Sequence, residues 1–383
     1  MNTVATTLAE WNGTDIDMTT VQRQFTALWG SINDGGNSGV PVRTSMFNLV
    51  VYTDSSERAS QVAENVAGLT GRRPSRLIIL VGDRMSENCI VDASVRLRCQ
   101  GSLSSGQAYE EVIMWAHGRA ADHLASVVIP LLLPELHTYL LWTSQPPFGL
   151  RLFHRLLGIA DRVVVDSSLF KSPGDGLANL ARLTRSHRQV LDFHWARLGP
   201  WREMIAQFFD NADYLPYARA IRSVRLEFGR EGNLQSATVG SLLVLGWIAS
   251  RLGWEPETTL DEVATGDVAL AALDGERLVT IDLQFRDHGA NAAGRLVGME
   301  LVSQPKGLPA ARFSIWRAED LSQAEVATDV YDGPKHSRIV PLISKSDSTL
   351  LAEELQVAGH DPLYDEVVAM ASRMAGREVW LTP

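Results

Sequence analysis

The stretch SMFNLVVYTDSSERASQVAENVAGLTGRRPSRLIILV, residues 45–81, predicts the fold class of this chain. Residues 45–52 are almost all apolar, which is typical of a strand buried on both faces of a parallel sheet. Residues 56–69 favour a helix that Gly71 ends, and residues 76–81 repeat the apolar strand pattern. A strand, a crossover helix and a second strand predict a parallel pair with the helix packed on the sheet.

The same alternation continues on both sides of this stretch. Thr19 and Gln22 have the spacing of a capping box at the start of an N-terminal helix, which the Gly- and Asn-rich loop 33–40 ends. The elements expected after residue 81 are a hairpin of 91–100 and 110–116 turning at 102–106, a helix from about 119, a strand at 138–143, a helix near 150–157 and a strand at 162–166. This pattern predicts an α/β fold with a mixed, largely parallel sheet flanked by helices.

The pattern changes in the second half of the chain. Residues 221–228 predict one more strand and residues 241–251 a helix, after which short strands follow one another without helices. These strands are expected at 268–273, 278–285, 295–302, 313–316 and 339–343, with closing helices at 349–357 and 363–374. A mainly antiparallel sheet is predicted here. We expect a helix and loop at 1–39, an α/β domain at 40–255 and a smaller α+β domain at 256–383.

Composition limits the classes of partner. The 383 residues carry a formal net charge of −10, which argues against a nucleic-acid partner because phosphate binding needs a concentrated basic face. The N-terminus lacks the basic and apolar regions of a secretory signal. The most apolar stretch, 126–142, is broken by Pro130 and Pro134 and is too short for a membrane span. We therefore expect a cytoplasmic protein with no membrane contact.

Sequence motifs would be the most direct sign of catalysis or cofactor binding. The sequence has no phosphate-binding G-x-x-x-x-G-K-[ST] motif and no dinucleotide-binding G-x-G-x-x-G motif between a strand and a helix. The nearest approach, Gly174 to Gly176, is interpreted as a turn. The nine histidines never pair at metal-ligand spacing, so no metal is expected. Asp166 lies at the carboxyl end of a strand, where α/β sheets place active sites, but we interpret it as a helix-capping residue.

The two cysteines, Cys89 and Cys99, flank a predicted strand. Ten residues of extended chain span about 33 Å, whereas a disulfide needs Cα atoms roughly 4.4–6.8 Å apart. An intramolecular disulfide would therefore require a bend that the pattern does not show. A thiol switch between subunits, or after a local rearrangement, is the alternative.

The segment DFHWARLGPWREMIAQ, residues 192–207, is called the signature segment below. Trp195, Arg197, Trp201 and Arg202 fall within eight positions around Pro200, a residue favoured in the first turn of a helix. Trp and Arg often anchor protein–protein contacts, so these four residues are candidate partner-binding residues. The alternative is that both tryptophans are core and both arginines form ion pairs. Trp201 heads an apolar stripe and should be buried, whereas Arg202 lies off that stripe.

The signature segment resembles that of the glucose-6-phosphate dehydrogenase assembly protein family, OpcA. Further blocks are similar to this family in the same order, from about position 40 to 255. They are RTSMFNLVVY at 43–52, RRPSRLIIL at 72–80, HLASVVIPLLLPEL at 123–136, ADRVVVDSS at 160–168 and LGWIASRL at 245–252.

The resemblance implies a non-catalytic role. It implies an assembly factor and allosteric activator that binds glucose-6-phosphate dehydrogenase, an enzyme of the oxidative pentose phosphate pathway, and stabilises its active oligomer. No catalytic residue and no cofactor is carried over. Two alternatives stay open: an enzyme acting on sugar phosphates with a site near Asp166, Ser167 and Ser168, and a redox adaptor using Cys89 and Cys99 with a thioredoxin-type partner.

Overall fold

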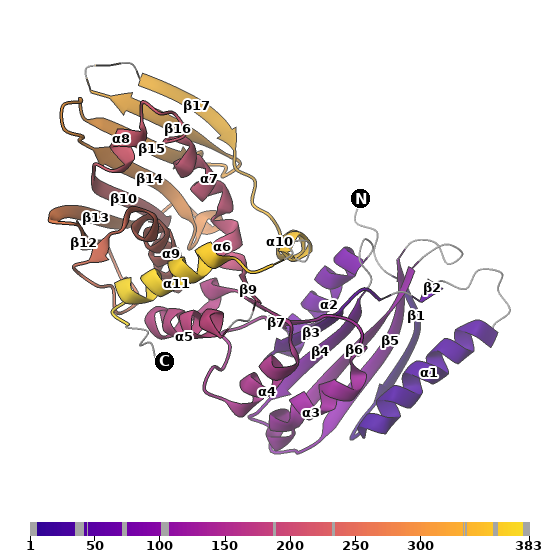
Figure 1. The fold of residues 1–383 in the computed structure, drawn as a ribbon. Helices are drawn as coiled ribbons and strands as arrows, with labels where there is room; N and C mark the ends of the chain where they lie inside the picture. Colours follow the sequence, from indigo (N-terminus) through magenta and orange to yellow (C-terminus); the bar gives the residue numbers. More distant parts are fainter. Residues whose placement is uncertain are drawn as a thin grey trace. The chain divides into compact units, whose positions relative to one another are not determined.

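The computed structural model describes residues 6–34, 42–43, 45–70, 75–100, 107–186, 189–231, 234–331, 333, 335–354 and 359–377 (Figure 1). These residues form two compact units. The first comprises the described residues of Met1–Val165, Arg188–Leu191 and Ser346–Gly359, and the second those of Asp166–His187, Asp192–Lys345 and His360–Pro383. The chain therefore passes from one unit to the other after residues 165, 187, 191, 345 and 359.

The first unit is built on a nine-stranded sheet in the order β1-β5-β6-β4-β3-β7-β8-β9, with β2 beside β6. The strands are β1 (Thr6–Gly13), β2 (Val42–Arg43), β3 (Asn48–Thr53), β4 (Arg76–Asp83), β5 (Val91–Gln100), β6 (Gln107–His117), β7 (Thr138–Trp142), β8 (Arg162–Val165) and β9 (Gln189–Asp192). From β6 to β8 the neighbours are parallel, whereas β5 is antiparallel to β1 and β6. The prediction of a mixed, largely parallel sheet is confirmed.

Helices pack on this sheet because its central strands bury both faces: every side chain of β3 and β7 is buried. The helices are α1 (Met18–Asp34) on β1 and β5, α2 (Ser56–Thr70) on β3 and β4, α3 (Leu124–Val128) on β4 and α4 (Arg151–Ile159) on β7. A late segment, α10 (Asp347–Glu354), packs on α2. The helix expected from about 119 is instead a 3₁₀ segment, Gly118–His123, followed by the short α3.

The N-terminal helix belongs to the first unit. Trp29 donates its indole N–H to the buried carboxylate of Glu110 on β6 at 2.8 Å, so α1 is fixed to the sheet of the first unit. The predicted capping box is wrong, because Asp17 accepts the N–H of Thr20 at 2.8 Å and Gln22 donates to the carbonyl of Pro130. Gly71, the turn 102–106 and most of the loop 33–40 lie outside the described residues.

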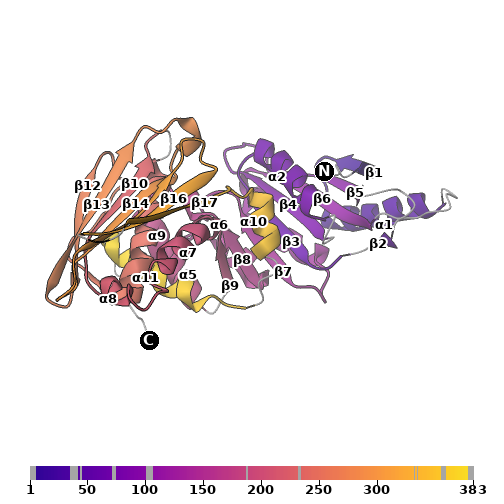
Figure 2. The same cartoon turned by 90° about the horizontal axis from the view of Figure 1, so that it is seen from above.

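The second unit is built on an eight-stranded sheet in the order β11-β12-β13-β10-β14-β15-β16-β17 (Figure 2). The strands are β10 (Ile221–Gly229), β11 (Glu255–Pro256), β12 (Val268–Asp274), β13 (Arg277–Arg286), β14 (Leu296–Ser303), β15 (Ala311–Arg317), β16 (Gln323–Val330) and β17 (Lys335–Pro341). Of their pairings in the described chain, β10 with β13 is parallel and the others are antiparallel. The mainly antiparallel sheet predicted for the C-terminal part is confirmed.

The helices of the second unit precede, interrupt and follow its strands along the chain. They are α5 (Pro173–Arg185), α6 (Phe193–Arg197), α7 (Gly199–Gln207), α8 (Leu215–Ala218), α9 (Leu234–Leu252) and α11 (Pro362–Met374). Both α5 and α11 pack against α9 and against each other. Gly174 and Gly176, interpreted as a turn, instead lie in the first turn of α5 after Pro173.

The boundaries between the two units do not lie at the predicted position near Pro256. β10 precedes that residue but lies in the middle of the second sheet, between β13 and β14. A division at 256 would remove a central strand and α9 from the unit whose core they fill. Strands and helices with no counterpart in the prediction are β1, β2, α5, β9, α8, β11 and β16.

Candidate functional site

The signature segment forms α6 and α7 of the second unit. Asp192 caps α6 by accepting the N–H of His194 at 3.0 Å, and Pro200 lies in the first turn of α7. Trp195 is 6% exposed and Trp201 is 2% exposed, so both indoles are core side chains. The expected burial of Trp201 is confirmed.

Arg197 forms a two-pronged ion pair with Asp166. Its Nη1 and Nη2 lie 2.9 and 2.8 Å from the two carboxylate oxygens of Asp166. The same carboxylate accepts the N–H and the hydroxyl of Ser168, so it caps the short helix Ser167–Leu169, as expected for this residue. Burial raises the pKa of Asp166, but the guanidinium of Arg197 offsets this and leaves the pKa below its ordinary value. The residues of the suggested enzymatic site are thus held in a structural ion pair and a cap.

The guanidinium of Arg202 lies over the indole of Trp195, with Cζ 3.3 Å from the ring centroid. A guanidinium in this position is attracted by the negative face of the ring. Its Nη2 also donates to the carbonyl of Trp195 at 3.4 Å. Arg317 on β15 lies over the ring of Trp201, with Cζ 5.9 Å from the ring centroid. Burial lowers the pKa of Arg317 to about 10. The four candidate partner-binding residues therefore make contacts within the second unit.

A buried polar cluster lies beneath α6. Asp192 accepts the hydroxyl of Tyr364 on α11 at 2.8 Å and the N–H of Ser167 at 2.9 Å. Burial raises the pKa of Asp192 to about 6, and the nearby charge of Asp166 adds to this. Burial lowers the pKa of His194 to about 4, and its Nδ1 has no hydrogen-bond partner among the described residues. Folding therefore shifts the ionisation of both groups toward their neutral forms.

These two shifts predict a pH signature for Asp192→Asn. The stability that comes from Asp192 is present below its ordinary pKa of 3.8 and is lost as pH rises through about 6. The stability that comes from neutral His194 is present above 6.5 and is lost as pH falls through about 4. The two slopes oppose each other in the wild type. Asp192→Asn removes the first, so its free energy of unfolding should fall, relative to wild type, by roughly 1.4 kcal/mol per pH unit on acidification from 6 to 4.

Urea unfolding at several pH values between 4 and 7 measures this difference. A second variant with His194→Gln in the Asp192→Asn background should flatten the profile again. Parallel profiles for wild type and Asp192→Asn would contradict the assignment.

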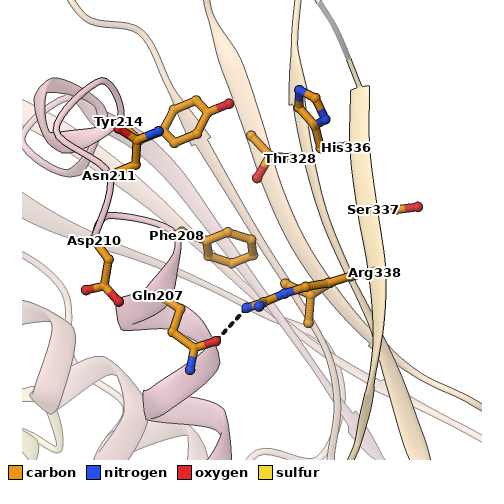
Figure 3. A pocket seen from close by; sticks show the side chains of 10 residues that line it. Gln207, Phe208, Asp210, Asn211, Tyr214, Thr328, His336, Ser337 and Arg338 are labelled. Atoms are coloured by element: carbon orange, nitrogen blue, oxygen red, sulfur yellow. Dashed lines mark hydrogen bonds between the residues drawn. The ribbon is translucent and has the colours of Figure 1, made fainter.

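An open groove of about 500 Å³ lies between the end of α7 and the last two strands of the second sheet (Figure 3). We call it the α7–β17 groove. It is lined by Gln207, Phe208, Asp210, Asn211, Tyr214, Val326, Thr328, His336, Ser337 and Arg338. Arg338 donates a hydrogen bond across it to Gln207. Phe208, one of the lining residues, packs on the buried ring of Phe313 with the two ring centroids 5.3 Å apart.

The groove is bordered by an exposed edge strand. β17 ends the strand order of the second sheet, and no described strand pairs with its outer edge. Nearly all of its side chains are exposed; Ile339 is 68% exposed, and Ile343 just beyond the strand is 75% exposed. Lys335 and Arg338 add positive charge to this edge. Unpaired N–H and C=O groups beside exposed apolar side chains are a template for pairing with another chain.

The structure does not bring the two cysteines together. Cys89 is exposed and precedes β5, whereas Cys99 is buried near the far end of that extended strand. Burial raises the pKa of the Cys99 thiol, which disfavours the reactive thiolate. In the described part of the chain, no group of three His, Cys, Asp or Glu side chains is placed to hold a metal ion, and no helix is long and apolar enough to cross a membrane.

The fold and the site define a two-unit α/β protein whose signature segment is built into the core of the second unit. Two family models match the chain: the glucose-6-phosphate dehydrogenase subunit N-terminal domain over residues 66–182, and the C-terminal domain of the same subunit over residues 188–368. Together they cover well over half of the sequence. The chain belongs to this family, the OpcA family of glucose-6-phosphate dehydrogenase subunits.

Two cyanobacterial relatives share its sequence over long stretches. The "Putative OxPP cycle protein OpcA" of Synechocystis sp. is 26% identical over 266 residues, 66% of this chain and 52% of the relative. The protein of the same name from Nostoc punctiforme is 25% identical over 311 residues, 79% of this chain and 65% of the relative. The chain thus spans about half to two thirds of the length of these relatives.

Solved oxidoreductase structures show a slight likeness. KijD10, a 3-ketoreductase from Actinomadura kijaniata, has a TM-score of 0.48 at 12% identity, covering 87% of this chain and 96% of its own. UDP-N-acetylglucosamine 3-dehydrogenase GnnA from Acidithiobacillus ferrooxidans has a TM-score of 0.46 at 10% identity, covering 88% and 99%. Nothing about the activity of this chain follows from a likeness at this level.

Proposed function

We propose that this chain is a non-catalytic subunit that binds glucose-6-phosphate dehydrogenase in the cytoplasm and activates it by stabilising its active oligomer. The observation that carries the proposal is the match of two family models, both described as parts of a glucose-6-phosphate dehydrogenase subunit, over residues 66–182 and 188–368. Such a subunit activates only if it binds the active state of the dehydrogenase more tightly than the inactive state.

The α7–β17 groove and the β17 edge are the surface that we assign to the dehydrogenase. Ile339 and Ile343 offer apolar contact area, and the outer edge of β17 offers backbone hydrogen bonds. Lys335 and Arg338 suit an acidic stretch on the dehydrogenase, in a chain that is otherwise strongly acidic. The matching surface would therefore be an extended segment with acidic and apolar side chains.

The four candidate residues of the signature segment would affect binding of the dehydrogenase only indirectly. Trp195 and Trp201 are buried, and Arg202 is stacked on Trp195, so none of these three presents a free side chain to a partner. They hold α7 on the sheet, and the end of α7 supplies Gln207 and Phe208 to the groove. Changes in the signature segment should weaken binding only as far as they displace α7.

The test is to mix the purified chain with the dehydrogenase of the same organism. A stable complex should form, and activity should rise most at low glucose 6-phosphate. Coupling energies of about 1–3 kcal/mol correspond to roughly 5- to 150-fold in affinity for the substrate. Linkage requires the reverse effect as well, so saturating glucose 6-phosphate should tighten the complex.

The surface is tested with Ile339→Asp, which places a charge on the β17 edge and should weaken the complex. Met85→Asp, at a side chain that is 92% exposed in the first unit, is the matched control and should leave it intact. If no complex forms at micromolar concentration, or the complex has unaltered kinetics, the proposed function is wrong. Turnover of a sugar phosphate by the isolated chain would favour the enzymatic alternative.

A further inference from the structure

A second hollow, on the second unit, gathers positive charge although the chain as a whole is acidic. Its volume is about 740 Å³, and its lining includes Arg219, Arg222, Arg277 and Lys306. None of its ten lining residues is acidic. In a sequence with 45 acidic and 35 basic residues, such a cluster differs sharply from the average composition. We call it the basic hollow.

The sheet topology brings these cations together at one end of three neighbouring strands. β10 and β13 are parallel with Ser223 opposite Thr280, so the amino ends of the two strands lie side by side. Arg222 lies at the start of β10 and Arg277 at the start of β13. β14 runs antiparallel to β10, so its carboxyl end lies beside the amino end of β10. The loop that follows β14 carries Lys306.

Hydrogen bonds hold the walls of the hollow in place. The N–H of Gln304 donates to the carbonyl of Ala220 at 2.9 Å, which fixes the loop after β14 beside the start of β10. The guanidinium of Arg277 donates to the carbonyl of Arg219 at 2.7 Å, which joins the β12–β13 turn to the same place. The cations are thus carried by segments that are fixed to one another.

Most of this positive charge is not neutralised within the protein. Arg277 is paired with Asp274, yet its Nε is buried and has no hydrogen-bond partner among the described residues. Burial and then the charge of Arg222 lower the pKa of Arg277, as expected where cations lie close together. Across the described ranges, no ion pair is found for Arg219, Arg222 or Lys306. An anionic ligand would relieve this repulsion.

We propose that the basic hollow binds a small phosphorylated molecule. The planar, forked guanidinium of arginine matches the oxygens of a phosphate group, and Arg219, Arg222 and Lys306 together can neutralise a ligand with two or more negative charges. The volume lies within the roughly 300–1,000 Å³ of small-molecule sites, so it holds a body attached to the phosphate as well as the phosphate itself. This site goes beyond the proposed function, because the chain binds the ligand without the dehydrogenase.

The test uses the full chain alone, with titration calorimetry at about 0.15 M salt. The probes are inorganic pyrophosphate, glucose 6-phosphate and ATP, which separate a need for phosphate alone from a need for an attached sugar or nucleoside. At least one probe should bind to a single site. Arg222→Ala combined with Lys306→Ala should weaken it by about tenfold or more, because charge-assisted hydrogen bonds are lost.

Arg286→Ala is the matched control, since Arg286 is an exposed arginine at the other end of β13, paired with Asp267. It should bind the probe like wild type, and melting curves should show that all variants are folded. Absence of binding by all three probes at millimolar concentration would overturn the proposal. So would equal weakening by Arg286→Ala, which would indicate unspecific attraction of anions. Because the dehydrogenase is absent from this test, either proposal can fail without the other.

Discussion

Replacing Trp201 with alanine is expected to lower the free energy of unfolding by about 3–5 kcal/mol, a large part of the stability of a typical protein. Trp201 is 2% exposed, and it lies at the start of α7, where Arg317 covers its ring. Removal of the indole leaves a cavity that the surrounding helices and strands can fill only in part. Urea or thermal unfolding of variant and wild type measures the loss.

Glu203→Ala provides the matched control for this prediction, because Glu203 is exposed on the same helix. It should change the free energy of unfolding by no more than about 0.5 kcal/mol. An unchanged unfolding midpoint for Trp201→Ala would mean that the indole does not carry the packing described above. In that case a direct contact of Trp201 with a partner would become the better explanation for the signature segment.

Arg197→Met is expected to cost about 3–5 kcal/mol, because it leaves the buried carboxylate of Asp166 without its cation. In the wild type the pKa of Asp166 is below its ordinary value of 3.8, so the ion pair stabilises the fold above that pH and the effect is lost as pH falls through the folded pKa. In the variant, the contribution of Asp166 to stability depends on pH with the opposite sign. Its destabilisation should grow as pH rises above about 4, since the buried carboxylate then has to ionise without a partner.

A double-mutant cycle distinguishes the loss of the pair from the loss of packing. Asp166→Asn in the Arg197→Met background should recover a part of the stability, because the buried charge is removed together with its partner. Strictly additive losses from the two single variants would show that the two side chains do not stabilise each other. Circular dichroism of each variant at neutral pH shows whether the fold is kept.

Much of the first sheet could be predicted from the sequence, because its central strands are continuous apolar runs. β3, β4 and β7 are buried on both faces, and such runs are distinctive when crossover helices separate them. β1 and β16 have no such pattern. β1, TTLAEWNG, is mostly exposed or half-buried, so packing gives it little apolar periodicity. Its conformation comes from pairing with β5, a contact between distant parts of the sequence.

The division of the chain could not be predicted because it follows contacts rather than sequence order. β10 lies among α/β-like elements in the sequence, yet it pairs with β13 and β14 from the later part. For the signature segment, the sequence indicated the buried stripe headed by Trp201, but not that Arg197 would reach back to Asp166. The α7–β17 groove was not predicted because β16 lacked a strand signal of its own, and half of the groove lies on β16 and β17.

The assignment of α10 to the first unit has a consequence for how the protein is made. α2 can gain its contact with α10 only after residues 347–354 have left the ribosome, whereas α2 itself emerges early. At about 5–20 residues per second, this interval is on the order of 15–60 s. During it, one side of α2 lacks its final cover and is exposed to chaperones and proteases. A nascent chain stalled before residue 346 should therefore be cleaved near α2 more readily than the released protein.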